Sequence, residues 1–169
     1  MFDLPPDQFT LALRELATAV SLVTIGKPDD RSGFVATSVA ACSTDPPRLI
    51  LCVNRESSSW HALERFGRFG LNFVRDCDSA IASRFAGFGG IRGNHRFEST
   101  EWITLPTGTQ VLETALAAID CRIEETFNRY DHAIILARVE AIRVCDNGKP
   151  LLWFQSRYHH LGEPQKKQL

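Results

Sequence analysis

The chain has 169 residues, with 19 Lys and Arg against 20 Asp and Glu, so its formal net charge at pH 7 is only −1. Such a balance provides no field that would attract nucleic acid or an anionic membrane surface, and we expect a small molecule or another protein as the partner. A chain of this length can bury a full core as one domain, which we assign to residues 1–162, leaving residues 163–169 as a polar C-terminal tail.

The beginning of the chain predicts one helix and a hairpin. After a plausible N-cap at Asp7, apolar residues recur at helical spacing from Phe9 to Val20 and predict an amphipathic helix. The β-branched stretches SLVTIG (21–26) and FVATSVA (34–40) are separated by turn-forming residues and predict two paired strands.

The middle of the chain alternates strands with short helices. The unbroken apolar run RLILCVN (48–54) follows two prolines and predicts a strand buried on both faces. SSWHALERFG (58–67) has a serine cap and a terminal glycine, both typical of a helix, while FGLNFV (69–74) alternates as a strand. DSAIASRFA (78–86) returns to a helical pattern, and the glycine-rich GFGGIRGN (87–94) predicts a flexible loop.

The last third of the chain is rich in strand patterns. LAAIDCRIEETF (116–127) and HAIILARVEAIRV (132–144) predict two long strands, and PLLWFQSRY (150–158) predicts a last one. Turns, rather than long helical crossovers, join most of the strands, which argues against a parallel sheet. We therefore expect a β-barrel of antiparallel strands with flanking helices.

Targeting signals and reactive motifs are largely absent from the sequence. MFDLPPDQFT lacks the basic and apolar regions of a signal peptide, and no apolar run is long enough to span a bilayer, so we expect a cytoplasmic protein. The five cysteines form no CxxC pair and the five histidines show no shared spacing, so we expect neither a disulfide framework nor a metal site. Neither GxGxxG, GxxxxGK[ST], HExxH nor GxSxG occurs in a fitting context, which leaves a hydrolase unsupported.

The stretch ATSVAACSTDPPRLILCVNRESSSW, residues 36–60, has the composition of a ligand site. The small residues of 36–43 would let a flat ring approach the backbone closely. Ser57, Ser58 and Ser59 enter a predicted helix, where hydroxyl and free N–H groups can receive a phosphate, although serines before a helix are also ordinary caps. The sequence thus offers places for the two ends of one ligand, a ring and its phosphate.

The order and spacing of several segments resemble a known family. They are FTLALRELATAVSLVT, GFVATSVAACSTDPPRLILCVNRESSSWHAL, RFGLNF, SRFAGFGG, HRFESTEW, CRIEETFNRYDHAIILARVEAI and PLLWFQSRY. From about Phe9 to Tyr158 the chain is similar to the flavin reductases of two-component monooxygenase systems, which are FMN-binding split-barrel proteins. Three positions depart from the usual pattern of that family: Ala19 and Ser156 replace glycines, and Gln110 stands where proline is usual.

This resemblance implies an antiparallel split barrel, commonly a homodimer, that binds FMN or FAD and reduces it with NADH or NADPH. It implies that the ring and ribityl chain lie near Thr37, Ser38, Cys52, Val53 and Asn54, and that the phosphate lies near Ser57, Ser59, Arg84, Phe85 and Arg96. It further implies a role for His132 at the nicotinamide.

The function that follows is an NAD(P)H-dependent flavin reductase that supplies reduced flavin to a separate monooxygenase component. In such an enzyme the nicotinamide stacks on the flavin and passes a hydride to it, and the protein supplies orientation rather than a nucleophile. Two alternatives stay open at this point. One is a reductase that retains its flavin and reduces a docked substrate such as a corrinoid cobalt, and the other is a non-catalytic FMN-binding module.

Overall fold

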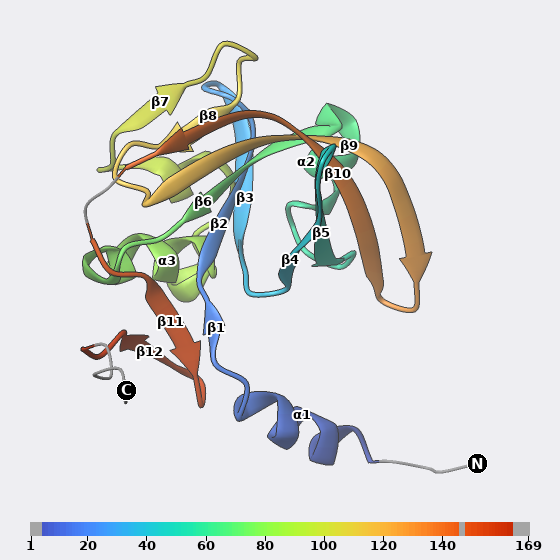
Figure 1. Ribbon diagram of the computed structural model, residues 1–169, viewed down its shortest axis with the longest axis vertical. Coiled ribbons are helices and arrows are strands. Elements are labelled where there is room, and N and C mark those ends of the chain that lie inside the picture. The colour runs from blue at the N-terminus through green and yellow to red at the C-terminus, as the bar shows by residue number, and fades with distance from the viewer. Residues whose placement is uncertain (1–4, 146–147, 164–169) are drawn as a thin grey trace.

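The computed structural model describes residues 5–145 and 148–163, and a curved antiparallel sheet dominates it (Figure 1). Within these residues the sheet has seven strands in the order β3-β2-β6-β9-β10-β5-β4. Their bounds are β2 Ser21–Lys27, β3 Asp30–Ala36, β4 Val39–Thr44, β5 Pro47–Asn54, β6 Arg68–Phe73, β9 Ala117–Arg129 and β10 His132–Val144. Almost all of the predicted tail, residues 163–169, lies outside the described residues.

Smaller elements cover the sides of this sheet. One small sheet contains β1 Thr18–Ala19, β11 Leu151–Phe154 and β12 Arg157–His160, and another contains β7 Trp102–Thr104 and β8 Gln110–Leu112. The helices are α1 Pro6–Arg14, α2 Trp60–Phe66 and α3 Ser79–Phe85, with the 3₁₀ turns η1 Asp76–Asp78, η2 Phe88–Gly90 and η3 Gly93–Phe97. The predicted combination of antiparallel strands and flanking helices is confirmed.

The sheet curls but does not close into a barrel. Its two edges are β3 and β4, and no strand pairing joins these edges in the described part of the chain. The chain passes directly from one edge to the other through Thr37 and Ser38, which belong to neither strand. The opening between the edges therefore lies beside the segment in which the sequence predicts a ligand site.

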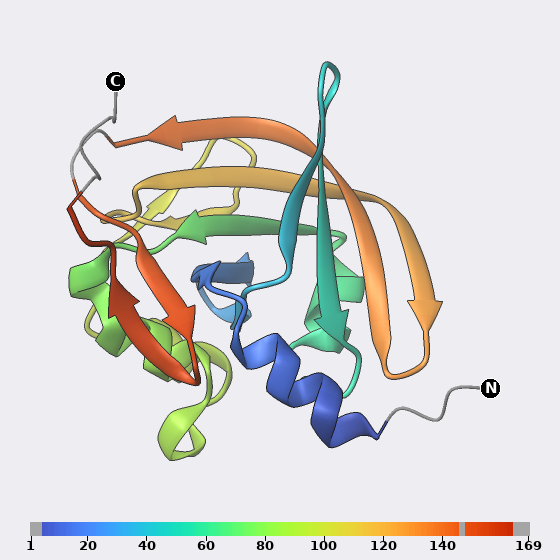
Figure 2. The same ribbon diagram turned by 60° about the horizontal axis from the view of Figure 1, so that its bottom comes forward.

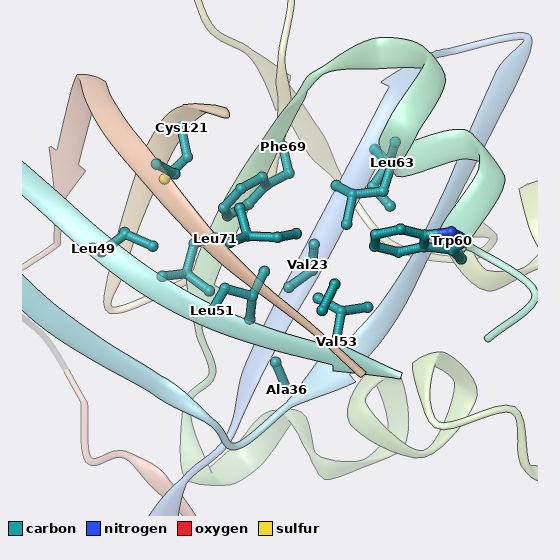
Figure 3. Close-up of a cluster of buried hydrophobic side chains, with 14 residues drawn as sticks. Val23, Ala36, Leu49, Leu51, Val53, Trp60, Leu63, Phe69, Leu71 and Cys121 are labelled. Carbon is teal, nitrogen blue, oxygen red and sulfur yellow. The ribbon is translucent and has the colours of Figure 1, made fainter. Parts of the chain in front are cut away.

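Two hydrophobic clusters stabilise the fold, one on each side of the sheet. Figure 3 shows the first, in which Trp60 and Leu63 of α2 pack against strand residues such as Leu51, Val53 and Leu71. The second cluster lies beneath α3, β8 and β11. Along β3, Phe34 and Ala36 pack in the first cluster while Val35 packs against the second. Side chains at odd positions of β3 therefore face α3 and β11.

Four sequence predictions need correction. The first helix ends at Arg14, not near Val20, and none of its residues is buried, so its apolar spacing reflects an exposed face and not a core contact. The predicted strand over 34–40 is interrupted at the crossing from β3 to β4.

The other two corrections concern the burial of β5 and the end of the chain. In β5, buried and accessible residues alternate, because only one face packs on the core. The single strand predicted over 150–158 is the β11–β12 hairpin, with Gln155 and Ser156 in the turn at φ 46° and 61°. In the described ranges we find no helix that is long and apolar enough to cross a membrane.

Candidate functional site

A buried guanidinium lies at the open edge of β3. Arg96, in η3, is only 5% exposed, and its Nη1 donates hydrogen bonds to the carbonyl oxygen of Gly33 at 2.6 Å and to Ser59 Oγ at 3.0 Å. Its Nη2 has one weak contact, Ser58 Oγ at 3.4 Å. Ser59 is fully buried, and its hydroxyl also donates to Gly33 O at 2.8 Å. We call Gly33, Ser58, Ser59 and Arg96 the arginine corner.

The arginine corner lacks a negative charge among the residues that the structure describes. The contacts of Arg96 are to neutral oxygens, and its Nε is buried without a hydrogen-bond partner. Burial lowers the pKa of Arg96 from its ordinary value, and the nearby positive charge of Arg92 lowers it further. Buried charges in proteins are usually paired, because removing an ion from water costs several kcal/mol. The arginine corner is therefore a candidate site for an anion such as a phosphate.

The three serines that precede α2 have different surroundings. Ser57 Oγ lies 3.3 Å from the backbone nitrogen of Ser59 and accepts its hydrogen, which is a local turn contact just before the helix. Ser59 is committed to Gly33, Arg96 and a 2.8 Å contact with Ser32 Oγ. Ser58 is the exposed serine of the three, and its hydroxyl is free to turn toward a ligand.

Cys52, Asn54 and His132, three more of the predicted ligand residues, lie on the face of the sheet that points away from the first cluster. The backbone nitrogen of Cys52 donates to Ser38 O at 3.1 Å, which places Ser38 next to β5. Asn54, two residues farther along β5, is the cross-strand partner of His132. Cys52, Asn54 and His132 alternate with the buried Leu51, Val53 and Ala133, so their side chains share the opposite face.

His132 has a carboxylate beside it. Its Nδ1 lies 2.9 Å from Oδ1 of Asp131, and this hydrogen bond is the main reason that the pKa of Asp131 lies below its ordinary value. With the proton on Nδ1, the ring leaves Nε2 free on an exposed surface. From Ser38, this residue is two residues along β5 and two strands across, or about 7 Å and about 10 Å. His132 thus lies about 12 Å from Ser38, a separation that a second nucleotide stacked on a ring at the β3–β4 crossing could span.

Three predicted site residues have side chains that point elsewhere. Val53 and Phe85 are 2% and 1% exposed and pack inside the two clusters, so only their backbone can face a ligand. Arg84 donates to Glu98 O and, at 2.5 Å, to Thr100 Oγ1, and it lines a separate cavity of about 760 Å³ together with residues of η1 and the 99–101 segment. The structure therefore brings Arg96, and not Arg84, next to the serines.

Sequence reasoning missed several residues near Thr37. A cavity of about 280 Å³ is lined by Val20, Val35, Thr37, Ala86, Phe88, Trp153 and Tyr158. A second cavity, of about 440 Å³, shares Thr37 and Trp153 with it and extends toward α1. Trp153 and Tyr158 belong to the segment PLLWFQSRY, but nothing in the local sequence pattern shows that β11 and β12 pack beside β3.

Comparison with known proteins identifies the family of this chain. Residues 13–162 match the family described as flavin reductase like domain. A relative named FMN reductase (NADH) RutF 2, from Methylorubrum extorquens, is 36% identical over 92% of this chain and 90% of its own length. The crystal structure of a putative flavin reductase from Haemophilus somnus has a TM-score of 0.87 at 26% identity, covering 94% of this chain and all of that one.

A second solved structure points to the same group. Nitrilotriacetate monooxygenase component B from Mycobacterium thermoresistibile has a TM-score of 0.83 at 27% identity and covers 96% of this chain and 93% of its own. The domain match spans most of the chain, and it includes both the arginine corner and the β3–β4 crossing. The chain belongs to the flavin reductase-like family.

Proposed function

We propose that this protein is an NAD(P)H:flavin oxidoreductase that releases reduced FMN to a separate monooxygenase component. Flavin reduction with a nicotinamide nucleotide follows from the family and from relatives named FMN reductase (NADH). The preference for FMN and NADH is supported by those names, and the partner by the likeness to a monooxygenase component B. A cytoplasmic location stays a prediction.

The observation that carries this proposal is the buried, uncompensated guanidinium of Arg96. A phosphate there would accept a hydrogen bond from Nη2, and the hydroxyl of Ser58 would add a second donor. Gly87 lies beside the guanidinium, because a Cβ built on it would be 3.7 Å from Arg96 Nη2, an ordinary contact distance. The residues present therefore fit a flavin phosphate.

The chemistry requires little of the side chains. A flavin held in this site would supply the redox chemistry, taking up a hydride from the nicotinamide. The protein holds the phosphate at the arginine corner, which fixes the position of the ring relative to Thr37 and Ser38. His132 then orients the second nucleotide through its free Nε2, while Asp131 holds the tautomer of the imidazole. In this proposal no side chain acts as a nucleophile.

A homodimer is part of the proposal and is supported by exposed apolar surface. Phe9, Leu11, Leu13 and Leu16, on and just after α1, are each at least half exposed. On the long hairpin, Phe127 and Ile134 are cross-strand partners and are 48% and 40% exposed. Figure 2 shows that α1 extends away from the curled sheet. A second copy would cover these residues.

Steady-state oxidation of NADH by the purified protein, with and without added FMN, tests the activity. Many turnovers per protein molecule support a flavin reductase, whereas FMN binding without NADH oxidation would indicate the non-catalytic module. Anaerobic reduction followed by ultrafiltration then separates the two enzyme classes. Reduced flavin in the filtrate supports release to a partner, and flavin held back with the protein would favour the reductase that retains its cofactor.

A further inference from the structure

The 280 Å³ cavity beside Thr37 is connected to the arginine corner by one short segment. Ala86 and Phe88 line the cavity, while Gly87 between them lies beside Arg96. The same connection runs along β3, because Gly33 belongs to the corner and Val35 and Thr37 line the cavity. From Gly33 to Thr37 the strand rises about 13 Å. The corner and the cavity can therefore hold two ends of one extended ligand.

The walls of this cavity suit a flat aromatic ring. Trp153 and Tyr158 pack edge to face, with ring centroids 5.1 Å apart and an interplanar angle of 67°. Val20 and Val35 are apolar, and Thr37 supplies a hydroxyl at the rim. The volume of about 280 Å³ is near the lower end for small-molecule sites, so it fits one end of a ligand and not the whole.

Phe88 has an unusual position for a large apolar side chain. It is 59% exposed although it lines the cavity, and it lies between Gly87 and Gly89, which have φ of 83° and 71°. A side chain built on Gly89 or Gly90 would meet nothing within 4 Å, so the backbone after Phe88 is free of packing. The exposed side chain of Phe88 would gain contact area if the aromatic ring of a ligand entered the cavity beside it.

From this geometry we propose that the flavin ring enters the cavity bounded by Val35, Trp153 and Tyr158, and that Phe88 closes over it. The inference rests on the proposed function and assigns a residue that positions the ring and limits its release. Because the ring is common to riboflavin and FMN, Phe88 contributes equally to both ligands, whereas Arg96 distinguishes them. In this proposal the glycine-rich segment 87–93 supports an aromatic cover over the ring.

The test is a fluorescence titration of the wild type and Phe88→Ala with riboflavin and with FMN. We expect the variant to bind both ligands roughly tenfold more weakly, from lost aromatic contact, and to release FMN faster in stopped-flow dilution. Phe88→Tyr keeps an aromatic side chain and should restore both the ligand affinities and the rate of FMN release. Leu161→Ala, which removes an exposed apolar side chain that lines none of the described cavities, is the matched control and should behave as wild type.

The outcomes separate this inference from the proposed function. If the wild type binds FMN and Phe88→Ala changes neither the riboflavin affinity nor the release rate, the role of Phe88 is overturned. Flavin binding by the protein then still stands. A loss confined to FMN also overturns it, because that pattern belongs to a phosphate contact. Wild type that binds no flavin overturns the proposed function and this inference with it. A melting temperature equal to that of wild type excludes a folding defect in the variant.

Discussion

Replacing Arg96 by glutamine separates the phosphate contact from the rest of the flavin. The change removes the charge and the unpartnered Nε, while a side-chain amide can still reach toward Gly33 O. A hydrogen bond to a charged group contributes about 1.5–3 kcal/mol, so loss of one such bond weakens FMN about tenfold to a hundredfold. Riboflavin has no phosphate and should bind with nearly wild-type affinity. Arg96→Lys keeps the charge but not the planar fork, and we expect an intermediate loss.

The assay for Arg96→Gln is a pair of titrations, with FMN and with riboflavin, on each variant. Arg138→Gln is the matched control, because it makes the same chemical change at a surface residue that pairs with Glu140. Arg84→Gln tests the position that the family resemblance implies, and the structure predicts no selective effect because Arg84 is bonded to Glu98 O and Thr100. Equal losses for FMN and riboflavin in Arg96→Gln, or no loss at all, would refute the arginine corner as a phosphate site.

Three further predictions follow from the site and the surface. His132→Ala should raise KM for NADH and leave the FMN affinity unchanged, and steady-state kinetics with unaltered KM and kcat would count against its role. Ser59→Ala should lower the free energy of unfolding by about 1–3 kcal/mol in urea titration, because Gly33 and Arg96 lose a buried partner; Ser58→Ala should instead spare stability and weaken FMN. Light scattering at micromolar concentration should give the mass of a dimer, and Leu13→Glu should shift that mass toward the monomer; a monomeric wild type contradicts the proposed homodimer.

Local sequence signals predict the elements that depend on local chemistry. The helix expected over 58–67 is α2, with Ser59 at its N-cap and Gly67 in the left-handed conformation at its C-cap, φ 62°. The C-terminal end is fixed locally by Gly67, whereas Ser59 makes no capping hydrogen bond and its hydroxyl is bonded to the distant Gly33. The interruption of the predicted strand at Thr37 and Ser38, by contrast, has no local signal. Those residues continue a β-branched run, and only the positions of the two sheet edges interrupt the strand.

The site shows the same division between local and distant information. The serines are recognisable from the sequence as a candidate phosphate-binding stretch, but the contact between Arg96 and Gly33 joins residues 63 positions apart and has no local signature. The resemblance marked Phe85 as a position near the ligand without showing that its side chain points into the core. At Ser156, by contrast, the usual glycine of the family has a visible reason, because the turn requires a positive φ of 61°.

The incomplete closure of the sheet is what makes a site possible at the arginine corner. In a closed barrel the outward carbonyl of an edge strand would pair with the N–H of a neighbouring strand. Here the carbonyl of Gly33 accepts hydrogen bonds from Ser59 and Arg96 instead, so a side-chain cation is held in the opening between the edges. Retaining a buried cation without a protein counter-charge is costly, and the phosphate of the proposed ligand would offset that cost on binding. The open edge thus links the fold to the proposed specificity for a phosphorylated flavin.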